Sequence, residues 1–155
     1  MTNNDIFCAL RTTFAFNDQT LLEIFHLADN ETTPAQLASW LSKPQTPEFA
    51  ELSDPQLASF LNGLINLKRG KREGEAAKPE ANLNNNMVFQ KLRIALNLQA
   101  DDLLILFQQV GVELSKNEIG AFFRKPGNKH YRECSDATLR QFLQAVEHHT
   151  PAITE

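Results

Sequence analysis

Two Ser-Asp pairs are the residues of this chain whose types first suggest catalytic chemistry. They are Ser53-Asp54 and Ser135-Asp136. A nucleophilic serine needs a histidine base and an acid that orients it. Each of these serines is instead followed by a helical apolar pattern, and serine is a preferred N-cap because its hydroxyl accepts a backbone N–H. We therefore interpret both serines as helix caps.

Cysteine and histidine offer no stronger catalytic or metal-binding candidate. Cys8 has only Arg11 as a basic residue within its turn, too little to activate the thiol, and two cysteines are not a disulfide framework. The four histidines are His26, His130, His148 and His149. None forms a His-x-x-x-His pair, and no glycine-rich phosphate loop follows a strand. The sequence predicts no enzyme, no metal and no cofactor.

The surroundings of the Ser-Asp pairs are repeated within the chain. Residues 43–65 and 125–147 both contain Lys-Pro, Glu-x-Ser-Asp and Leu-x-x-Phe-Leu at the same spacing. With an offset of 82 residues, 3–65 aligns with 85–147 without a gap, and 17 of the 63 positions are identical. Two copies are too few for a solenoid, so we predict a tandem pair of small homologous domains.

Apolar residues with helical spacing predict four helices in each copy. The first helix is expected over about 5–14, with Asn3 or Asn4 as its cap. The third and fourth helices begin at residues that we predict to be structural caps, namely Thr33, Ser53, Ser115 and Ser135. No segment has the alternating pattern of a strand. The predicted fold is all-α, with two tandem homologous four-helix units and no sheet.

The composition between the copies predicts a linker. Residues 70–85 are dominated by Gly, Pro, Ala, Asn and charged side chains, without an apolar stripe. We therefore divide the chain into a first helical unit over 1–69, a flexible basic linker over 70–85 and a second helical unit over 86–150.

One charged pair recurs in both copies without a capping explanation. Glu51 and Glu133 each precede a cap serine by two positions, and Arg11 and Arg93 also occupy equivalent positions. We predict a structural ion pair in each copy, joining the arginine of the first helix to the glutamate before the fourth.

Charge is distributed unevenly along the chain. Residues 1–67 have a net charge of −6, residues 68–85 of +2 and residues 86–155 of zero. A nucleic-acid-binding protein usually presents a basic face, and the first copy is the opposite.

Nucleic-acid binding is nevertheless the alternative function. Residues 21–41 resemble a helix-turn-helix, although any tight helical hairpin has this pattern. The candidate contacts in the linker and second copy are Lys68, Arg69, Lys71, Arg72, Arg124, Lys125, Lys129 and Arg132.

No apolar run approaches the 18 residues of a membrane span, and the N-terminus lacks the pattern of a signal peptide. We expect a cytoplasmic protein that makes no membrane contact.

Four stretches resemble a known family: NNDIFCALR, LADNETTPAQLASWL, ELSDPQLASFL and LNGLINLKRGKRE, with their second-copy equivalents. Through them the chain resembles the YehS-like family of uncharacterised bacterial proteins, which are built from a tandem domain of unknown function. The resemblance covers nearly the whole chain and implies a bacterial, cytoplasmic, duplicated protein. It implies no activity, so it assigns no catalytic or binding residue.

The sequence thus favours a non-enzymatic interaction or adaptor protein. Its partner would be an unidentified protein or a second copy of the chain in a homodimer.

Overall fold

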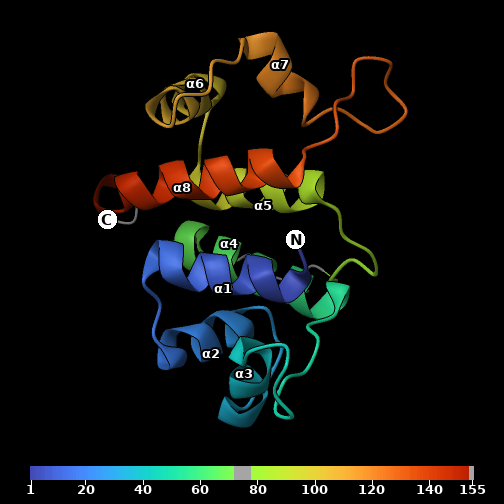
Figure 1. The fold of residues 1–155 in the computed structure, drawn as a ribbon, viewed down its shortest axis with the longest axis vertical. Helices are drawn as coiled ribbons and strands as arrows, with labels where there is room; N and C mark the ends of the chain where they lie inside the picture. Colours follow the sequence, from blue (N-terminus) through green and yellow to red (C-terminus); the bar gives the residue numbers. More distant parts are fainter. Residues whose placement is uncertain (72–77, 154–155) are drawn as a thin grey trace. The chain divides into compact units, whose positions relative to one another are not determined.

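The computed structural model describes residues 1–71 and 78–153, and these residues form eight helices and no strand (Figure 1). The chain divides into two compact units, Met1–Leu83 and Asn84–Glu155, called here the first and second units. The predicted all-α fold of two homologous units is therefore confirmed. Of the predicted flexible linker, residues 72–77 lie outside the described part of the chain.

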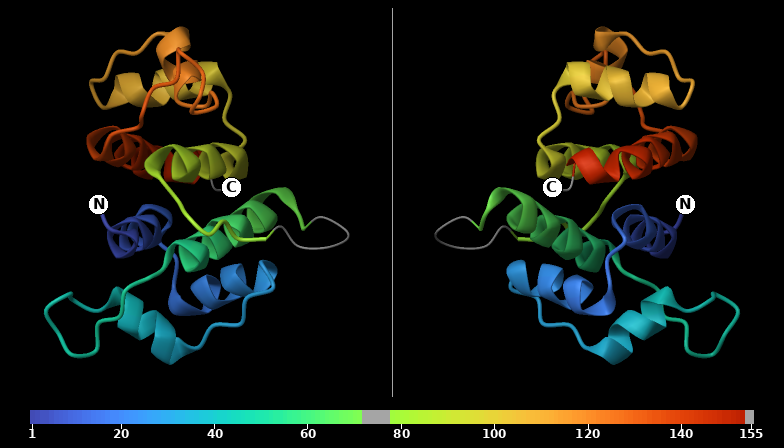
Figure 2. Two further views of the ribbon diagram at one scale, coloured as in Figure 1. Left: turned by 90° about the vertical axis from the view of Figure 1, so that its right-hand side faces the viewer. Right: turned by 90° about the vertical axis from the view of Figure 1, so that its left-hand side faces the viewer.

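Each unit has two layers of two helices (Figures 1 and 2). The first unit contains α1 (Asn3–Phe14), α2 (Asp18–Leu27), α3 (Pro34–Leu41) and α4 (Asp54–Arg69). The second unit contains α5 (Asn85–Leu96), α6 (Ala100–Gln109), α7 (Lys116–Ala121) and α8 (Asp136–Ile153). In each unit the first and last helices lie side by side, and the two middle helices form the other layer.

The core of each unit is an aromatic cluster with one ring from each helical segment. The rings are Phe7, Phe25, Trp40 and Phe60 in the first unit, and Phe89, Phe107, Phe122 and Phe142 in the second. All eight side chains are buried, and the equivalent pairs Phe7–Phe60 and Phe89–Phe142 have ring centroids 5.0 and 4.7 Å apart. Because buried aromatic rings dominate the burial energy of a small core, they explain why both copies keep an aromatic residue at each of these positions.

The predicted cap residues accept backbone hydrogen bonds at the starts of their helices. Thr33, Ser53 and Ser115 each form a capping box with the residue three positions later. The Ser135 hydroxyl accepts the N–H of Thr138 at 3.0 Å. These contacts satisfy N–H groups of the first turn that have no partner within the helix.

The first helix of each unit starts differently from the prediction. The cap of α1 is Thr2, whose hydroxyl accepts the N–H of Asp5 at 3.0 Å, and the cap of α5 is Asn84. Asn3 and Asn4, which the sequence suggested as caps, lie inside the first turn of α1. Their side chains are therefore available for contacts with other segments.

Asn4 and its equivalent Asn86 hold the loop before the last helix. The Asn4 side chain is buried, and its Nδ2 donates to the carbonyls of Trp40 (3.0 Å) and Ala50 (2.9 Å). Its Oδ1 accepts the N–H of Leu52 at 2.9 Å. Asn86 makes the same three bonds in the second unit, with Phe122 O, Arg132 O and Cys134 N–H. One buried amide therefore joins three segments of each unit.

Asn3 and Asn85 add a second connection beside the first. Asn3 Nδ2 donates to Leu52 O at 3.1 Å and to Asp54 Oδ1 at 2.6 Å. Asn85 Nδ2 donates in the same way to Cys134 O and to Asp136 Oδ1. This connection explains why the Asn-Asn pair and the Asp of Ser-Asp occur together in both copies.

The structure corrects the predicted ion pairs. Arg11 pairs with Asp18 across 3.5 Å and not with Glu51. Arg93 lies over the Phe123 ring, 4.7 Å from its centroid, and not against Glu133. The asparagines of the first turn make the connection that the sequence predicted for these charges, because their side chains form hydrogen bonds with the loop.

Asp54 gives the first unit a dependence on pH. Hydrogen bonds from the Asn3 side chain and the Leu83 N–H lower the pKa of Asp54. Because the folded pKa lies below the unfolded value of about 3.9, this stabilisation is present above that pH and is lost as the pH falls through the folded pKa. We expect Asp54→Asn to reduce the loss of stability between neutral pH and about pH 3, since the amide that replaces the carboxyl group does not titrate in this range.

Trp40 fluorescence measures this effect, because Trp40 is the single tryptophan and is buried in the first unit. Acid titrations in a fixed concentration of urea compare the two proteins. Identical pH slopes for wild type and Asp54→Asn would show that Asp54 contributes no proton-linked stability.

Candidate binding surface of the second unit

The two units differ most in the charge of the third helix and the loop that follows it. Residues 116–132 carry five Lys or Arg side chains and one acid, a net charge of +4. The equivalent residues 34–50 carry one of each, a net charge of zero. Because the fold is shared, this difference is not needed to build the unit.

Part of this charge surrounds a surface hollow of about 410 Å³, which we call the basic hollow. It is lined by Asn117, Glu118, Ala121, Arg124, His130 and Arg132. The equivalent residues of the first unit are Ala35, Gln36, Ser39, Ser42, Glu48 and Ala50. Three cationic or titratable side chains thus replace a serine, a glutamate and an alanine.

Arg132 is held in place through its main chain and its side chain. Its N–H donates to Ala121 O at 3.1 Å, and its carbonyl accepts from Asn86 Nδ2 at 2.8 Å. Its Nη1 donates to Glu118 Oε2 at 3.1 Å, and its guanidinium lies 5.2 Å from the centroid of the Phe122 ring. These contacts fix the guanidinium while leaving its other N–H groups without a partner among the described residues.

Glu118 is ionised in this arrangement. Its Oε1 accepts the N–H of Ser115 at 3.1 Å, and its own N–H donates to the Ser115 hydroxyl. The hydrogen bonds with Ser115, together with Arg132, lower the pKa of Glu118. The hollow therefore contains one carboxylate opposite Arg124, His130 and Arg132.

The loop that carries His130 is folded around Asn128. The Asn128 N–H donates to Lys125 O at 2.9 Å, and its carbonyl accepts the Tyr131 N–H at 3.0 Å. The Asn128 side chain accepts the His130 N–H at 2.8 Å. Asn128 thus fixes the backbone of His130, whose imidazole lines the basic hollow.

The other candidate nucleic-acid contacts are not gathered with these side chains. Lys125 and Lys129 are exposed on the loop of the second unit but do not line the hollow. In the first unit, Arg69 is the exposed last residue of α4. Arg72 lies outside the described residues.

Lys68 and Lys71 have intramolecular contacts in the first unit. Lys68 Nζ lies 5.8 Å from the centroid of the Phe14 ring, and burial lowers the pKa of this amine. Lys71 forms an ion pair with Asp29 at 2.8 Å. Among the predicted contacts that the structure describes, Arg124 and Arg132 line the same basic hollow.

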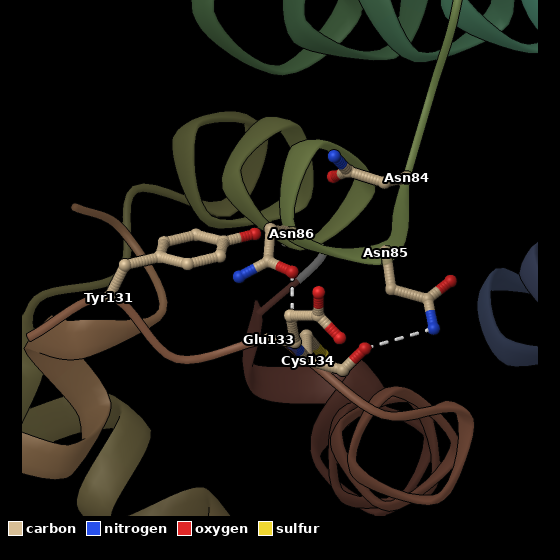
Figure 3. A pocket seen from close by; sticks show the side chains of 6 residues that line it. All are labelled: Asn84, Asn85, Asn86, Tyr131, Glu133 and Cys134. Atoms are coloured by element: carbon tan, nitrogen blue, oxygen red, sulfur yellow. Dashed lines mark hydrogen bonds between the residues drawn. The ribbon is translucent and has the colours of Figure 1, made fainter. Parts of the chain in front are cut away.

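A second hollow of about 340 Å³ lies in the same unit, and we call it the polar hollow (Figure 3). It is lined by Asn84, Asn85, Asn86, Tyr131, Glu133 and Cys134. Burial, with the charge of Asp136, raises the pKa of Cys134 to about 12. This thiol is therefore protonated at neutral pH and a poor nucleophile. Sequence reasoning missed this hollow, because Asn84–Asn86 and residues 131–134 meet only in the folded unit.

Comparison with known proteins places the chain in a family. The family model described as "Protein of unknown function (DUF1456)" matches residues 3–70 and 85–149. The chain belongs to the DUF1456 family. One matched segment lies in each of the two units, which confirms the expected resemblance to a family with a tandem domain.

A relative in Escherichia coli (strain K12) is described as "Uncharacterized protein YehS". It is 42% identical over 147 residues, and the match covers 94% of each chain. No solved structure matches the chain. The DUF1456 description names no activity. Within the described part of the chain, no helix is long and apolar enough to cross a membrane.

Proposed function

We propose that the protein is a cytoplasmic interaction protein without enzymatic activity, and that its second unit binds an acidic segment of a partner protein. The observation that carries this proposal is the basic hollow, where Arg124, His130 and Arg132 stand at positions that are Ser42, Glu48 and Ala50 in the first unit. Both copies share one fold, so the residues that differ between them are not needed to build it. We therefore place the binding site among the residues that differ between the copies.

The contacts in the basic hollow suit a carboxylate ligand. Arginine binds carboxylates through two parallel N–H bonds, which is stronger and more directional than a lysine contact. Glu118 occupies one edge of Arg132 and fixes its plane. The Arg124 side chain makes no hydrogen bond or ion pair within the described residues, so it can bind an incoming anion without breaking an existing contact.

Nucleic-acid binding is the second candidate. The surplus of positive charge on residues 116–132 favours it, because phosphate contacts are made by Lys and Arg. Against it, the first unit would repel a polyanion, and α3, the recognition helix of the predicted helix-turn-helix, contains no Lys or Arg. The compact basic hollow fits a short acidic segment better than the long backbone of a nucleic acid.

The first unit supplies the substitutions that test the proposal. A variant with Arg124→Ser, His130→Glu and Arg132→Ala carries residues that the same fold already accommodates. We expect its affinity for a fluorescently labelled oligoglutamate peptide to fall by about tenfold or more, because a few central residues, often arginines, carry most of the binding energy of an interface. Fluorescence anisotropy at low and high salt measures the change.

Arg140→Ser and Arg124→Ser form a matched pair, since each removes one charge from the second unit and only Arg124 lines the hollow. Arg140→Ser is expected to bind the peptide nearly as the wild type does. Tight binding of single-stranded DNA with a steep salt dependence, and none of the peptide, would favour the second candidate. Peptide binding that is equal in the triple variant and the wild type would exclude the basic hollow.

A further inference from the structure

Glu51 and Glu133 are retained in both copies, yet the contacts within each unit give them no role. Both side chains are exposed, and neither forms a hydrogen bond or an ion pair within the described residues. Each follows an aromatic residue by two positions, Phe49 in the first unit and Tyr131 in the second. The aromatic–acid pair is therefore a shared feature that the fold does not explain.

Residues 130–133 have no helical structure, and neighbouring side chains of this segment line two different hollows. His130 and Arg132 line the basic hollow. Tyr131 and Glu133 line the polar hollow (Figure 3). Residues that are neighbours in the chain thus contribute to two different hollows, His130 and Arg132 to the basic one and Tyr131 and Glu133 to the polar one.

The polar hollow offers oxygen acceptors. The Glu133 carboxylate, the Tyr131 hydroxyl and Asn85 Oδ1 make no hydrogen bond within the described chain. The Asn85 nitrogen already donates to Cys134 O and to the carboxylate of Asp136. Asn84 Oδ1 accepts the N–H of Met87, so the nitrogen of Asn84 is the uncommitted amide donor here.

The electrostatics of the hollow favour a positive ligand. Burial, with the charge of Glu133, raises the pKa of the Tyr131 hydroxyl, which places the carboxylate within electrostatic reach of the phenol. The guanidinium of Arg132 also acts on Cys134 at this hollow. Its own charge is paired with Glu118, and it lies against the Phe122 ring, so it offsets the Glu133 carboxylate only in part.

We infer that the polar hollow of the second unit binds a primary alkylammonium group, such as a lysine side chain or a polyamine. An ammonium group has three N–H donors and no acceptor, so it can donate to the Glu133 carboxylate and to other oxygens that line the hollow. The Tyr131 ring supplies an apolar wall for the methylene chain and a face that attracts a cation. A hollow of about 340 Å³ accommodates such a chain.

Two probes distinguish the sources of the ammonium group: spermidine, and an acetylated and amidated peptide with a single lysine. A norleucine peptide of the same length is the uncharged control. In ¹H–¹⁵N NMR spectra, the side-chain amides of Asn84 and Asn85 are expected to shift with the ammonium probes and not with the norleucine peptide. A preference for the lysine peptide would indicate a protein ligand, and a preference for spermidine a free polyamine.

Glu133→Gln is expected to weaken binding about tenfold or more, because it removes the charge of the hollow and keeps its shape. Glu51→Gln makes the same change in the first unit and is expected to leave these NMR shifts unchanged. Tyr131→Phe, which inserts the aromatic residue of the first unit, is expected to weaken binding less than Glu133→Gln does. Wild-type affinity in Glu133→Gln, or shifts equally large for the norleucine peptide, would overturn the inference.

This inference does not depend on the proposed function. Arg124→Ser is expected to reduce binding of the oligoglutamate peptide while leaving the ammonium-induced shifts of Asn84 and Asn85 in place. Circular dichroism checks that each variant is folded, which is expected because the substituted side chains do not belong to the buried core.

Discussion

Replacing Asn4 with alanine is expected to lower the free energy of unfolding of the first unit by about 2–6 kcal/mol, because each of two buried polar groups left without a partner costs about 1–3 kcal/mol. The groups that lose their partner are the Trp40 carbonyl and the Leu52 N–H, both in buried residues. Ala50 is exposed, so water can replace the bond to its carbonyl. Urea unfolding followed by Trp40 fluorescence measures the loss.

Two further variants separate the hydrogen bonds from the volume of the side chain. Asn4→Asp keeps the shape and the acceptor for Leu52 N–H but places a carboxylate against two carbonyl oxygens, so we expect it to be at least as destabilising as alanine at neutral pH. Asn86→Ala makes the equivalent change in the second unit and is expected to leave the Trp40 transition nearly unchanged. An Asn4→Asp protein as stable as the wild type would show that the donated bonds contribute nothing.

Gly63→Ala is expected to destabilise the first unit, although alanine is the better helix former. A Cβ atom at Gly63 would overlap the carbonyl oxygen of Ile24 and lie 2.8 Å from its carbonyl carbon. The atoms in the way belong to the backbone of α2, so no side-chain rotation relieves the overlap. Overpacking costs about 1–3 kcal/mol or more. Because the blocking atoms are backbone atoms, we take the upper end of this range, about 3 kcal/mol. After the gain of about 1 kcal/mol in helix propensity, the expected net loss is about 2 kcal/mol or more.

Gly120→Ala is the matched control for this prediction. Gly120 also lies in a helix, α7, but a Cβ atom there would meet nothing within 4 Å. We expect Gly120→Ala to stabilise the second unit by up to about 1 kcal/mol. Thermal unfolding followed by circular dichroism measures the second-unit variant, and Trp40 fluorescence measures the first. Stabilisation by both alanines would contradict the close approach of α2 to α4.

Gly63 also shows how the two copies have diverged within one fold. Its equivalent in the second unit is Ala145, which is fully buried. The helices α6 and α8 therefore pack with a methyl group at the position where α2 and α4 have none. A glycine that looks unfavourable within a helix is thus explained by tertiary packing.

The sequence alone determined the duplication, the eight helices and the residues that begin several of them. These features depend on interactions between near neighbours in the chain. A cap such as Thr33 bonds a residue three positions away, and an apolar stripe requires only the helical period. Caps and apolar stripes can therefore be predicted from the sequence without knowledge of the contacts between distant segments.

The role of the Asn-Asn pair was decided by the tertiary structure. Asn3 and Asn4 fit a local capping rule, but Thr2 provides the cap, and their amides bond groups as far as 51 residues away. The expected pairing of Arg11 with Glu51 was wrong for a similar reason, since Arg11 pairs with Asp18 in the folded unit. A charged residue at equivalent positions of two copies indicates that both copies need it. It does not identify the residue that it contacts, because contacts depend on which segments the fold brings together.

The two hollows likewise exist only in the folded second unit. Arg124 and Arg132 were recognised from the sequence as cations, but their common hollow requires the loop to return to α7. Tyr131 and Glu133 acquire a common site because hydrogen bonds from Asn85 and to Asn86 hold residues 131–134 against the start of α5. Sequence therefore determined which residues carry charge, and the return of the loop decided which of those charges act together.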